Sequence, residues 1–376
     1  MAAAAPGIQP ITMPKWGLAM TEGMVAEWHV NEGEEVKGGQ EICDIETSKI
    51  TNAFESPADG PLRRRVVGAG ETVPVGALLA VVAPPEVSDA DVDAFVAEFQ
   101  ESFATKAAEA AEAGPEPETV EIGGRRFRYL KTGGGDGAPL VLVHGFGGDL
   151  NNWLFNQADL SEGRAVYALD LPGHGGSAKD VGEGTVEAMS RALVAFLDVQ
   201  GVGPAHLVGH SLGCAVILDL ALRDPARALS LTLVCPAGLG PDVNMAYVEG
   251  FIAASRRKQL KPVLDMLVAD PELIGREMIE DVLRYKRLDG AEAALKAVAG
   301  AAFAGGRQAA RYDGRLGELR VPVQVIWGRE DRIVPAAHAQ NVPPNVQTHV
   351  LDGAGHMVHM EKAAEVNRLI AGFMRG

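Results

Sequence analysis

The sequence of residues 205–222 is AHLVGHSLGCAVILDLAL, and this stretch decides the fold of the larger part of the chain. Its apolar first part predicts a buried strand, and its last part predicts a helix. Between them lies GHSLG at positions 209–213, a G-x-S-x-G sequence that turns the chain sharply from strand to helix. Such a turn exposes the side chain of its central residue, so Ser211 is a candidate nucleophile. Glycines flank the turn because larger side chains would clash there.

Other apolar runs on either side of this stretch predict further strands. They are PLVLV, AVYAL, SLTLV and VQVIW, at 139–143, 165–169, 230–234 and 323–327. Continuous apolar strands separated by helical segments are typical of a parallel sheet that is covered on both faces. We therefore predict an α/β domain over residues 119–376. Residues 242–312 interrupt it with helix-rich sequence, which predicts a lid over the active site.

Two polar residues follow predicted strands in the last third of the chain. Asp331 comes just after VQVIWG, and His356 lies in GAGHMVH after the next strand. Ser211, Asp331 and His356 therefore occur in the order in which the nucleophile, acid and base of an α/β-hydrolase triad follow one another. Glu330 is the alternative acid, but Asp331 occupies the position that matches the triad pattern.

An earlier strand ends in HGFGG at positions 144–148, which predicts an oxyanion loop. The backbone N–H groups of Phe146 and Leu212 are the expected donors to a tetrahedral oxyanion. Together with DLPGHGGS at 170–177, these motifs resemble the α/β-hydrolase family across residues 119–376. Several polar neighbours of the motifs are interpreted as structural residues. These are His144, His210, Cys214 and His359.

The first 83 residues contain an internal repeat. A shift of 37 positions aligns glycines with glycines and apolar residues with apolar residues. Among the aligned pairs are Gly23 and Gly60, Gly33 and Gly70, Gly39 and Gly76, and Ile42 and Leu79. Two copies indicate one domain made of two similar halves. Short β-rich runs broken by glycine turns predict that this domain is all-β, with Lys49 at the junction of the halves.

The segment MPKWGLAMTEGMVAEWHVNEGEEVKGGQEICDIETSKI, residues 13–50, resembles the lipoyl domain of 2-oxo acid and acetoin dehydrogenase complexes. This resemblance implies a flattened β-barrel over residues 1–83 with lipoate in amide linkage on Lys49. Biotinyl domains share the fold but have methionines on both sides of the lysine. Here the neighbours are Ser48 and Ile50, which favours lipoate.

Residues 84–118 predict an acidic linker that contains a helix. From position 86 the segment has ten acidic residues and one basic residue. Apolar residues at helical spacing form one face over 88–104. They are Val92, Phe95, Val96, Phe99 and Phe103. This face is expected to pack on the hydrolase-type domain, to self-associate or to dock a partner enzyme. The arginines at 63–65 are interpreted as an exposed strand face without a special role.

A lipoyl domain joined to a hydrolase-type domain is similar to the acyltransferase component of acetoin dehydrogenase complexes. The resemblance implies that an acetyl group passes from lipoyl-Lys49 to coenzyme A. It also implies two partners, a thiamin-diphosphate-dependent acetoin-cleaving enzyme and a flavin-dependent dihydrolipoamide dehydrogenase. The chain departs from the usual component because it has no H-x-x-x-D-G motif. Transfer is therefore predicted to fall to the Ser211, His356 and Asp331 triad.

Two alternative functions remain open from the residues alone. The hydrolase motifs equally fit an ester or thioester hydrolase that uses water. The chain could also be a non-catalytic scaffold that carries a swinging arm. The length of the acyl chain and the oligomeric state, including a homo-oligomer, are also left open.

Charge and composition exclude several classes of function. The net charge of −16 argues against nucleic acid as a partner. Cys43, Cys214 and Cys235 have no metal-like spacing, so no metal site is expected, and so few cysteines fit a reducing compartment. The sequence shows no secretory signal and no apolar run of about 18 residues. We therefore expect a cytoplasmic protein without a membrane span.

Overall fold

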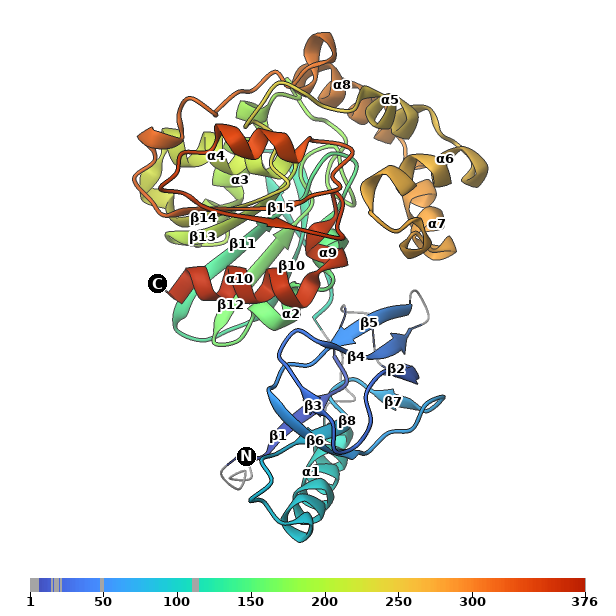
Figure 1. Cartoon of the computed structure of the whole chain (residues 1–376). Coiled ribbons are helices and arrows are strands. Elements are labelled where there is room, and N and C mark those ends of the chain that lie inside the picture. The colour runs from blue at the N-terminus through green and yellow to red at the C-terminus, as the bar shows by residue number, and fades with distance from the viewer. Residues whose placement is uncertain are drawn as a thin grey trace. The chain divides into compact units, whose positions relative to one another are not determined.

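The computed structural model describes residues 7–14, 16, 20, 22–47, 51–109 and 115–375 (Figure 1). The chain forms two compact units, Met1–Gly114 and Pro115–Gly376. Lys49, Ser48 and Ile50 lie outside the described residues. Among the helices that are described, each is too short or too polar to cross a membrane.

The first unit contains two four-stranded antiparallel sheets. One has the order β1 (Gln9–Thr12), β8 (Leu78–Val82), β6 (Gly60–Arg65) and β3 (Glu35–Val36). The other has the order β5 (Thr51–Glu55), β4 (Glu41–Glu46), β2 (Glu22–Trp28) and β7 (Thr72–Pro74). Gly33 and Gly70, which the repeat aligns, have φ angles of 89° and 82°. Only glycine adopts such angles readily, which explains why the repeat keeps it at both positions.

A core of alternating apolar side chains belongs to these two sheets. Val25, Ile42, Ile45, Leu62 and Leu79 have no exposed surface. Successive strand residues point to opposite faces, so one apolar residue in two is enough to fill such a core. The all-β fold predicted for residues 1–83 is confirmed in the part of that range that the structure describes.

The helix α1 (Asp89–Glu109) packs on the first sheet through a second apolar cluster. Val92 is fully buried against β8, and Phe95, Val96 and Phe99 lie around it. Two ion pairs hold the first turns of the helix to β6. These join Arg63 to Asp89 at 2.6 Å and Arg64 to Asp93 at 2.5 Å.

These contacts correct two interpretations of the sequence. The apolar face of residues 88–104 was expected to cover the hydrolase-type domain or to meet another protein, but it extends the core of the first unit. The arginines at 63–65 were given no role, but two of them fasten the helix to the sheet. Neither contact could be read from local sequence, because each joins residues 26 or 29 positions apart.

Shortening the buried valine of α1 tests this packing. Val92→Ala removes two methyl groups from a position with no exposed surface, so we expect the first unit to lose about 2 kcal/mol of unfolding free energy. Calorimetric melting of the full chain measures this loss. Val199→Ala is the matched control because Val199 is 53% exposed. Equal melting of the two variants would contradict the packing of α1.

The second unit is built on an eight-stranded sheet. Its order is β16 (Gln347–Leu351), β15 (Val323–Gly328), β14 (Ala228–Val234), β13 (Ala205–His210), β11 (Gly137–Val143), β12 (Arg164–Leu169), β10 (Arg125–Gly133) and β9 (Glu118–Ile122). Neighbouring strands from β16 to β12 are parallel, while β10 is antiparallel to both β12 and β9. The predicted parallel sheet is confirmed, with an antiparallel pair added at one edge.

Helices cover both faces of this sheet. Figure 1 shows α3 (Val186–Val199) and α4 (Leu212–Arg223) on one face and α2 (Gln157–Leu160) and α10 (Ala363–Arg375) on the other. Both faces of the central strands are therefore buried, as their continuous apolar sequence requires. The carboxyl ends of β13, β14 and β15 lead into the loops that carry the candidate site.

Along the chain, a group of helices follows β14 and precedes β15, within the segment predicted to be a lid. The group contains α5 (Met245–Ala253), α6 (Arg257–Leu264), α7 (Arg276–Lys286) and α8 (Ala291–Ala302). Figure 1 shows these helices gathered beyond one end of the sheet. Their sequence interrupts the strand pattern because they form a layer of their own.

Candidate functional site

Ser211 lies in a strained turn between β13 and α4. Its φ and ψ angles are 53° and −118°, a conformation that costs free energy for a residue other than glycine. A Cβ atom at Gly209 would lie 2.6 Å from the backbone nitrogen of Cys214. A Cβ atom at Gly213 would lie 2.2 Å from the carbonyl oxygen of Val143. Both glycines of the motif are therefore required by close backbone packing.

Asp331 lies in the loop after β15, and four donors surround its carboxylate. Oδ1 accepts hydrogen bonds from the backbone N–H groups of Ile333 at 2.8 Å and Val334 at 2.9 Å. Oδ2 accepts one from Trp327 Nε1 at 3.0 Å and lies 2.8 Å from His356 Nδ1. With its hydrogen on Nδ1, the imidazole of His356 has Nε2 available to accept a proton.

The structure joins Ser211 to His356 through its neighbour His210. His210 Nε2 lies 2.9 Å from the backbone oxygen of His356, and the centroids of the two rings are 4.7 Å apart. No hydrogen bond between Ser211 Oγ and His356 occurs in the described part of the chain. Such bonds are often long in unliganded enzymes and tighten around the substrate. His210 was interpreted as structural, and its contact fixes the position of the His356 loop.

The predicted oxyanion loop, residues 144–148, approaches the serine closely. A Cβ atom at Gly145 would lie 2.8 Å from the Cβ atom of Ser211. Phe146 follows Gly145, and Leu212 follows Ser211, so both candidate donors are next to this contact. Within the described residues, nothing accepts a hydrogen bond from the backbone N–H of Phe146 or Leu212. Two such free donors beside the serine suit a developing oxyanion.

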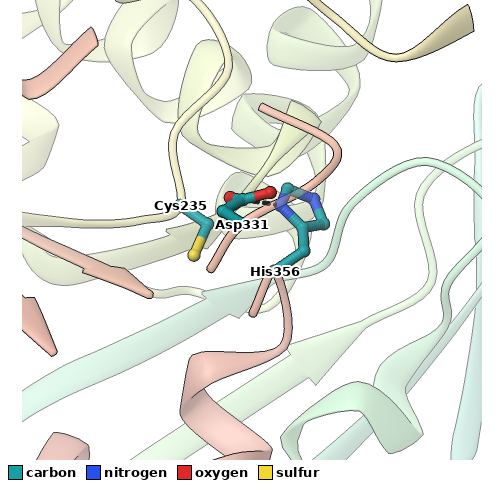
Figure 2. Close-up of side chains that lie close together, drawn as sticks. All are labelled: Cys235, Asp331 and His356. Atoms are coloured by element: carbon teal, nitrogen blue, oxygen red, sulfur yellow. Dashed lines mark hydrogen bonds and ion pairs between the residues drawn. The ribbon is translucent and has the colours of Figure 1, made fainter. Parts of the chain in front are cut away.

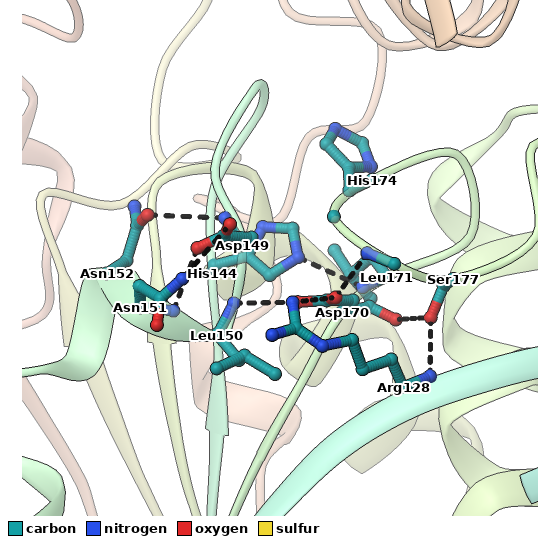
Figure 3. A network of polar contacts seen from close by, with 12 residues as sticks. Arg128, His144, Asp149, Leu150, Asn151, Asn152, Asp170, Leu171, His174 and Ser177 are labelled. Atoms are coloured by element: carbon teal, nitrogen blue, oxygen red, sulfur yellow. Dashed lines mark hydrogen bonds and ion pairs between the residues drawn. The ribbon is translucent and has the colours of Figure 1, made fainter. Parts of the chain in front are cut away.

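The ring of His144 anchors the oxyanion loop (Figure 3). Burial lowers the pKa of His144 to about 4, so the ring is neutral at physiological pH. Its Nε2 accepts a hydrogen bond of 2.9 Å from the backbone N–H of Leu171. Its Nδ1 therefore carries the hydrogen, and it donates to the carbonyl oxygen of Gly145 at 2.7 Å. The tautomer is fixed, and with it the position of the loop.

Asp170 holds the chain just after this loop. Its Oδ1 accepts from the backbone N–H of Leu150 at 2.8 Å, and its Oδ2 accepts from that of Gly176 at 2.7 Å. Arg128 approaches Oδ2 to 3.3 Å (Figure 3). The resemblance identified DLPGHGGS only as a family motif, and this function of Asp170 was not predicted from it. The aspartate at the carboxyl end of a predicted strand was the signal for it.

Cys235 is a neighbour of the triad that sequence analysis did not identify (Figure 2). It follows β14 with a φ angle of 45°. Its Sγ atom and potential ligand atoms of Asp331 and His356 all lie within 4.8 Å of one another. Burial raises the pKa of the Cys235 thiol well above its ordinary value. The thiol is therefore protonated at physiological pH.

Glu361 ties the segment predicted to be a lid to the loop of His356. Its two carboxylate oxygens accept hydrogen bonds from the backbone N–H groups of Gly355 at 2.8 Å and Ala269 at 2.7 Å. The backbone N–H of Met357 adds a bond of 3.0 Å to the carbonyl oxygen of Leu267. Residues 267–269, which follow α6, are therefore fastened to the residues on either side of His356, the predicted catalytic base.

The pKa of Glu361 predicts a pH-dependent stability. Burial raises this pKa from 4.5 to about 7. A carboxyl group whose pKa is higher in the folded chain stabilises the fold at low pH and loses this effect as the pH rises through the folded value. Relative to Glu361→Gln, the wild type should therefore lose about 2–3 kcal/mol of unfolding free energy between pH 4.5 and 7 and then stay level.

Urea unfolding of the full chain at several pH values measures this difference. Glu249→Gln serves as the control because Glu249 is exposed on α5. A difference between wild type and Glu361→Gln that does not vary with pH would show that Glu361 does not titrate in this range.

Comparisons with known proteins agree with both units. A family model described as alpha/beta hydrolase fold matches residues 138–363, and one described as biotin-requiring enzyme matches residues 9–82. The solved structure of 2-hydroxy-6-oxo-6-phenylhexa-2,4-dienoate hydrolase from Rhodococcus is similar with a TM-score of 0.64 and 23% identity. That match covers 70% of this chain and 99% of the other, and it shows the fold alone.

Two curated relatives match nearly the whole chain. Each is named the dihydrolipoyllysine-residue acetyltransferase component of the acetoin cleaving system. The protein from Pseudomonas putida is 48% identical over 98% of this chain and 99% of its own length. The protein from Cupriavidus necator is 47% identical over 99% of this chain and 98% of its own length. The chain therefore belongs to the family of dihydrolipoyllysine-residue acetyltransferase components of acetoin cleaving systems, in which a lipoyl domain is joined to an α/β-hydrolase domain.

Proposed function

We propose that the chain transfers an acetyl group from lipoyl-Lys49 to coenzyme A through Ser211, His356 and Asp331. The enzyme is a dihydrolipoyllysine-residue acetyltransferase, like its two full-length relatives. The observation that carries the assignment to this triad is the hydrogen-bonded Asp331–His356 pair beside the strained turn of Ser211. No second acyltransferase motif is present in the sequence to take this role.

Lys49 is the proposed attachment point for lipoate. In the sequence it falls between β4 and β5, which pair with Glu46 opposite Thr51. This antiparallel pair provides a rigid base on either side of the attachment segment, which suits a carrier residue. When loaded, the lipoyl arm supplies the acetyl group as a thioester.

The proposed reaction uses the site in two halves. Ser211 Oγ attacks the thioester carbonyl carbon while His356 Nε2 takes the serine proton, and Asp331 keeps the imidazole oriented. The free N–H groups of Phe146 and Leu212 stabilise the oxyanion. His356 then gives its proton to the departing thiol of the arm, which leaves acetyl-Ser211. In the second half, His356 takes the proton of the coenzyme A thiol, which attacks acetyl-Ser211 and regenerates the serine.

Two partner enzymes follow from this role. A thiamin-diphosphate-dependent acetoin-cleaving enzyme would load the arm on Lys49. A dihydrolipoamide dehydrogenase would reoxidise it after the acetyl group has left. The support for these partners is that both full-length relatives are components of an acetoin cleaving system.

The fate of the acetyl group separates transfer from hydrolysis. The lipoylated full chain is loaded with labelled acetyl groups, coenzyme A is added, and acetyl-CoA and acetate are separated. We expect the label in acetyl-CoA. Label mainly in acetate would mean that the domain uses water as the acceptor, as the solved hydrolases of this fold do by name. Label that stays on the arm would support a scaffold without its own activity.

A further inference from the structure

Three basic side chains form a cluster at the start of α6. Arg256, Arg257 and Lys258 are consecutive and exposed. None of the three makes an ion pair or a side-chain hydrogen bond within the residues that the structure describes. The charge of Arg257 helps to lower the pKa of Glu280, but the carboxylate of Glu280 is already paired with Arg276 at 2.8 Å. The cluster is therefore a local excess of positive charge in a chain of net charge −16.

The cluster lies on a segment that joins the two catalytic loops. Before it, Phe251 on α5 packs on the oxyanion loop, with its ring centroid 6.0 Å from that of Phe146. After it, the carbonyl oxygen of Leu267 accepts the hydrogen bond from Met357, next to His356. Residues 252–266 therefore connect a contact with the oxyanion loop to a contact with the His356 loop, and the cluster lies within this connection in the sequence.

The position of these charges is unfavourable for the helix itself. The first turn of α6 has no acidic residue, and its N-cap, Arg256, makes no side-chain capping bond. Positive charges at the positive end of a helix dipole destabilise the helix. A bound anion would reverse this cost, because it would neutralise the side chains and meet the helix dipole favourably.

We propose that Arg256, Arg257 and Lys258 bind the phosphate groups of the coenzyme A acceptor. The inference rests on the proposed function and adds a binding site to it. Guanidinium groups match phosphate geometry with paired hydrogen bonds, and a lysine adds a point charge. The long pantetheine arm of coenzyme A separates its phosphates from its thiol, so the phosphates bind on the lid while the thiol reaches acetyl-Ser211. The lipoyl arm has no phosphate, so the cluster distinguishes the acceptor from the donor.

Steady-state transfer by the lipoylated full chain tests the site. The variant is R256Q/R257Q/K258Q. The control is R276Q/R284Q/K296Q, which removes the same charge from exposed lid positions that are paired with Glu280, Asp281 and Glu292. Coenzyme A is compared with pantetheine, an acceptor that has the same thiol arm without phosphates.

We expect the KM for coenzyme A to rise at least about tenfold in the variant, with kcat and the KM for pantetheine unchanged. The control should stay within about twofold of the wild type. An unchanged KM for coenzyme A, or an equal change for both acceptors, would overturn the proposal while transfer itself stands. If the wild type instead releases only acetate, the proposed function fails. In that case, calorimetric titration with adenosine 3′,5′-bisphosphate tests the cluster by itself. Binding to the wild type that is lost in R256Q/R257Q/K258Q supports a phosphate site. Equal binding to both proteins, or no binding to the wild type, overturns it.

Discussion

Ser211→Ala is expected to lower acetyl transfer from the lipoyl arm to coenzyme A about 10⁴-fold or more. The alanine keeps the backbone of the turn but has no oxygen to carry the acetyl group, so both halves of the reaction lose their nucleophile. Ser211 is only 7% exposed, and within the residues that the structure describes its hydroxyl group has no hydrogen-bond partner. The loss should therefore come without a lower melting temperature.

The matched control for this change is Ser230→Ala. Ser230 is also buried, but its Oγ is bound to His206 at 2.7 Å, near the start of β14. It should keep transfer within a few-fold of the wild type. Rates are measured as acetyl-CoA formed from the loaded full chain. If Ser211→Ala transferred acetyl groups as fast as Ser230→Ala, the triad would have no role in the reaction.

Lys49→Arg is expected to abolish transfer from the chain's own arm while leaving the triad intact. Arginine keeps the positive charge but has no amine that can form the amide with lipoate. The variant should therefore show no lipoyl group by intact mass and no transfer above background. Free acetyl-dihydrolipoamide should still donate to Ser211 at the wild-type rate, because the second unit is unchanged.

Lys37→Arg is the control for the carrier residue because Lys37 is an exposed lysine of the same unit. It should be lipoylated and active like the wild type. A lipoyl group found on Lys49→Arg would mean that another lysine is the attachment point. Loss of activity with the free donor as well would mean that Lys49 acts in catalysis and not only as the carrier.

Structural features that depend on the local pattern of residues could be predicted from the sequence. The repeat predicted the all-β unit because paired glycines such as Gly33 and Gly70 keep left-handed turns at matching places. Continuous apolar runs predicted the parallel sheet because both faces of its central strands are buried. The order of the motifs along the chain predicted Asp331 and His356 as the acid and the base of a triad. The structure joins these two side chains by a 2.8 Å hydrogen bond.

Features that depend on distant contacts were not accessible in this way. The face of α1 is apolar, but its sequence does not say which surface it covers, and only the folded chain shows that Val92 packs on β8. Glu361 is one of many acidic residues in the sequence, and its role appears only when Ala269, 92 positions away, approaches it. Cys235 similarly becomes a neighbour of Asp331 only because β14 and β15 lie side by side.

The central claim is that the acetyl group passes through Ser211, and labelling of this residue tests it most directly. The full chain is loaded on its lipoyl arm with labelled acetyl groups without coenzyme A, quenched and digested, and the label is located by mass spectrometry. The mechanism predicts label on the Ser211 peptide that disappears into acetyl-CoA when coenzyme A is added. Rapid formation of acetyl-CoA with no label on Ser211 at any time, and an undiminished rate in Ser211→Ala, would contradict it.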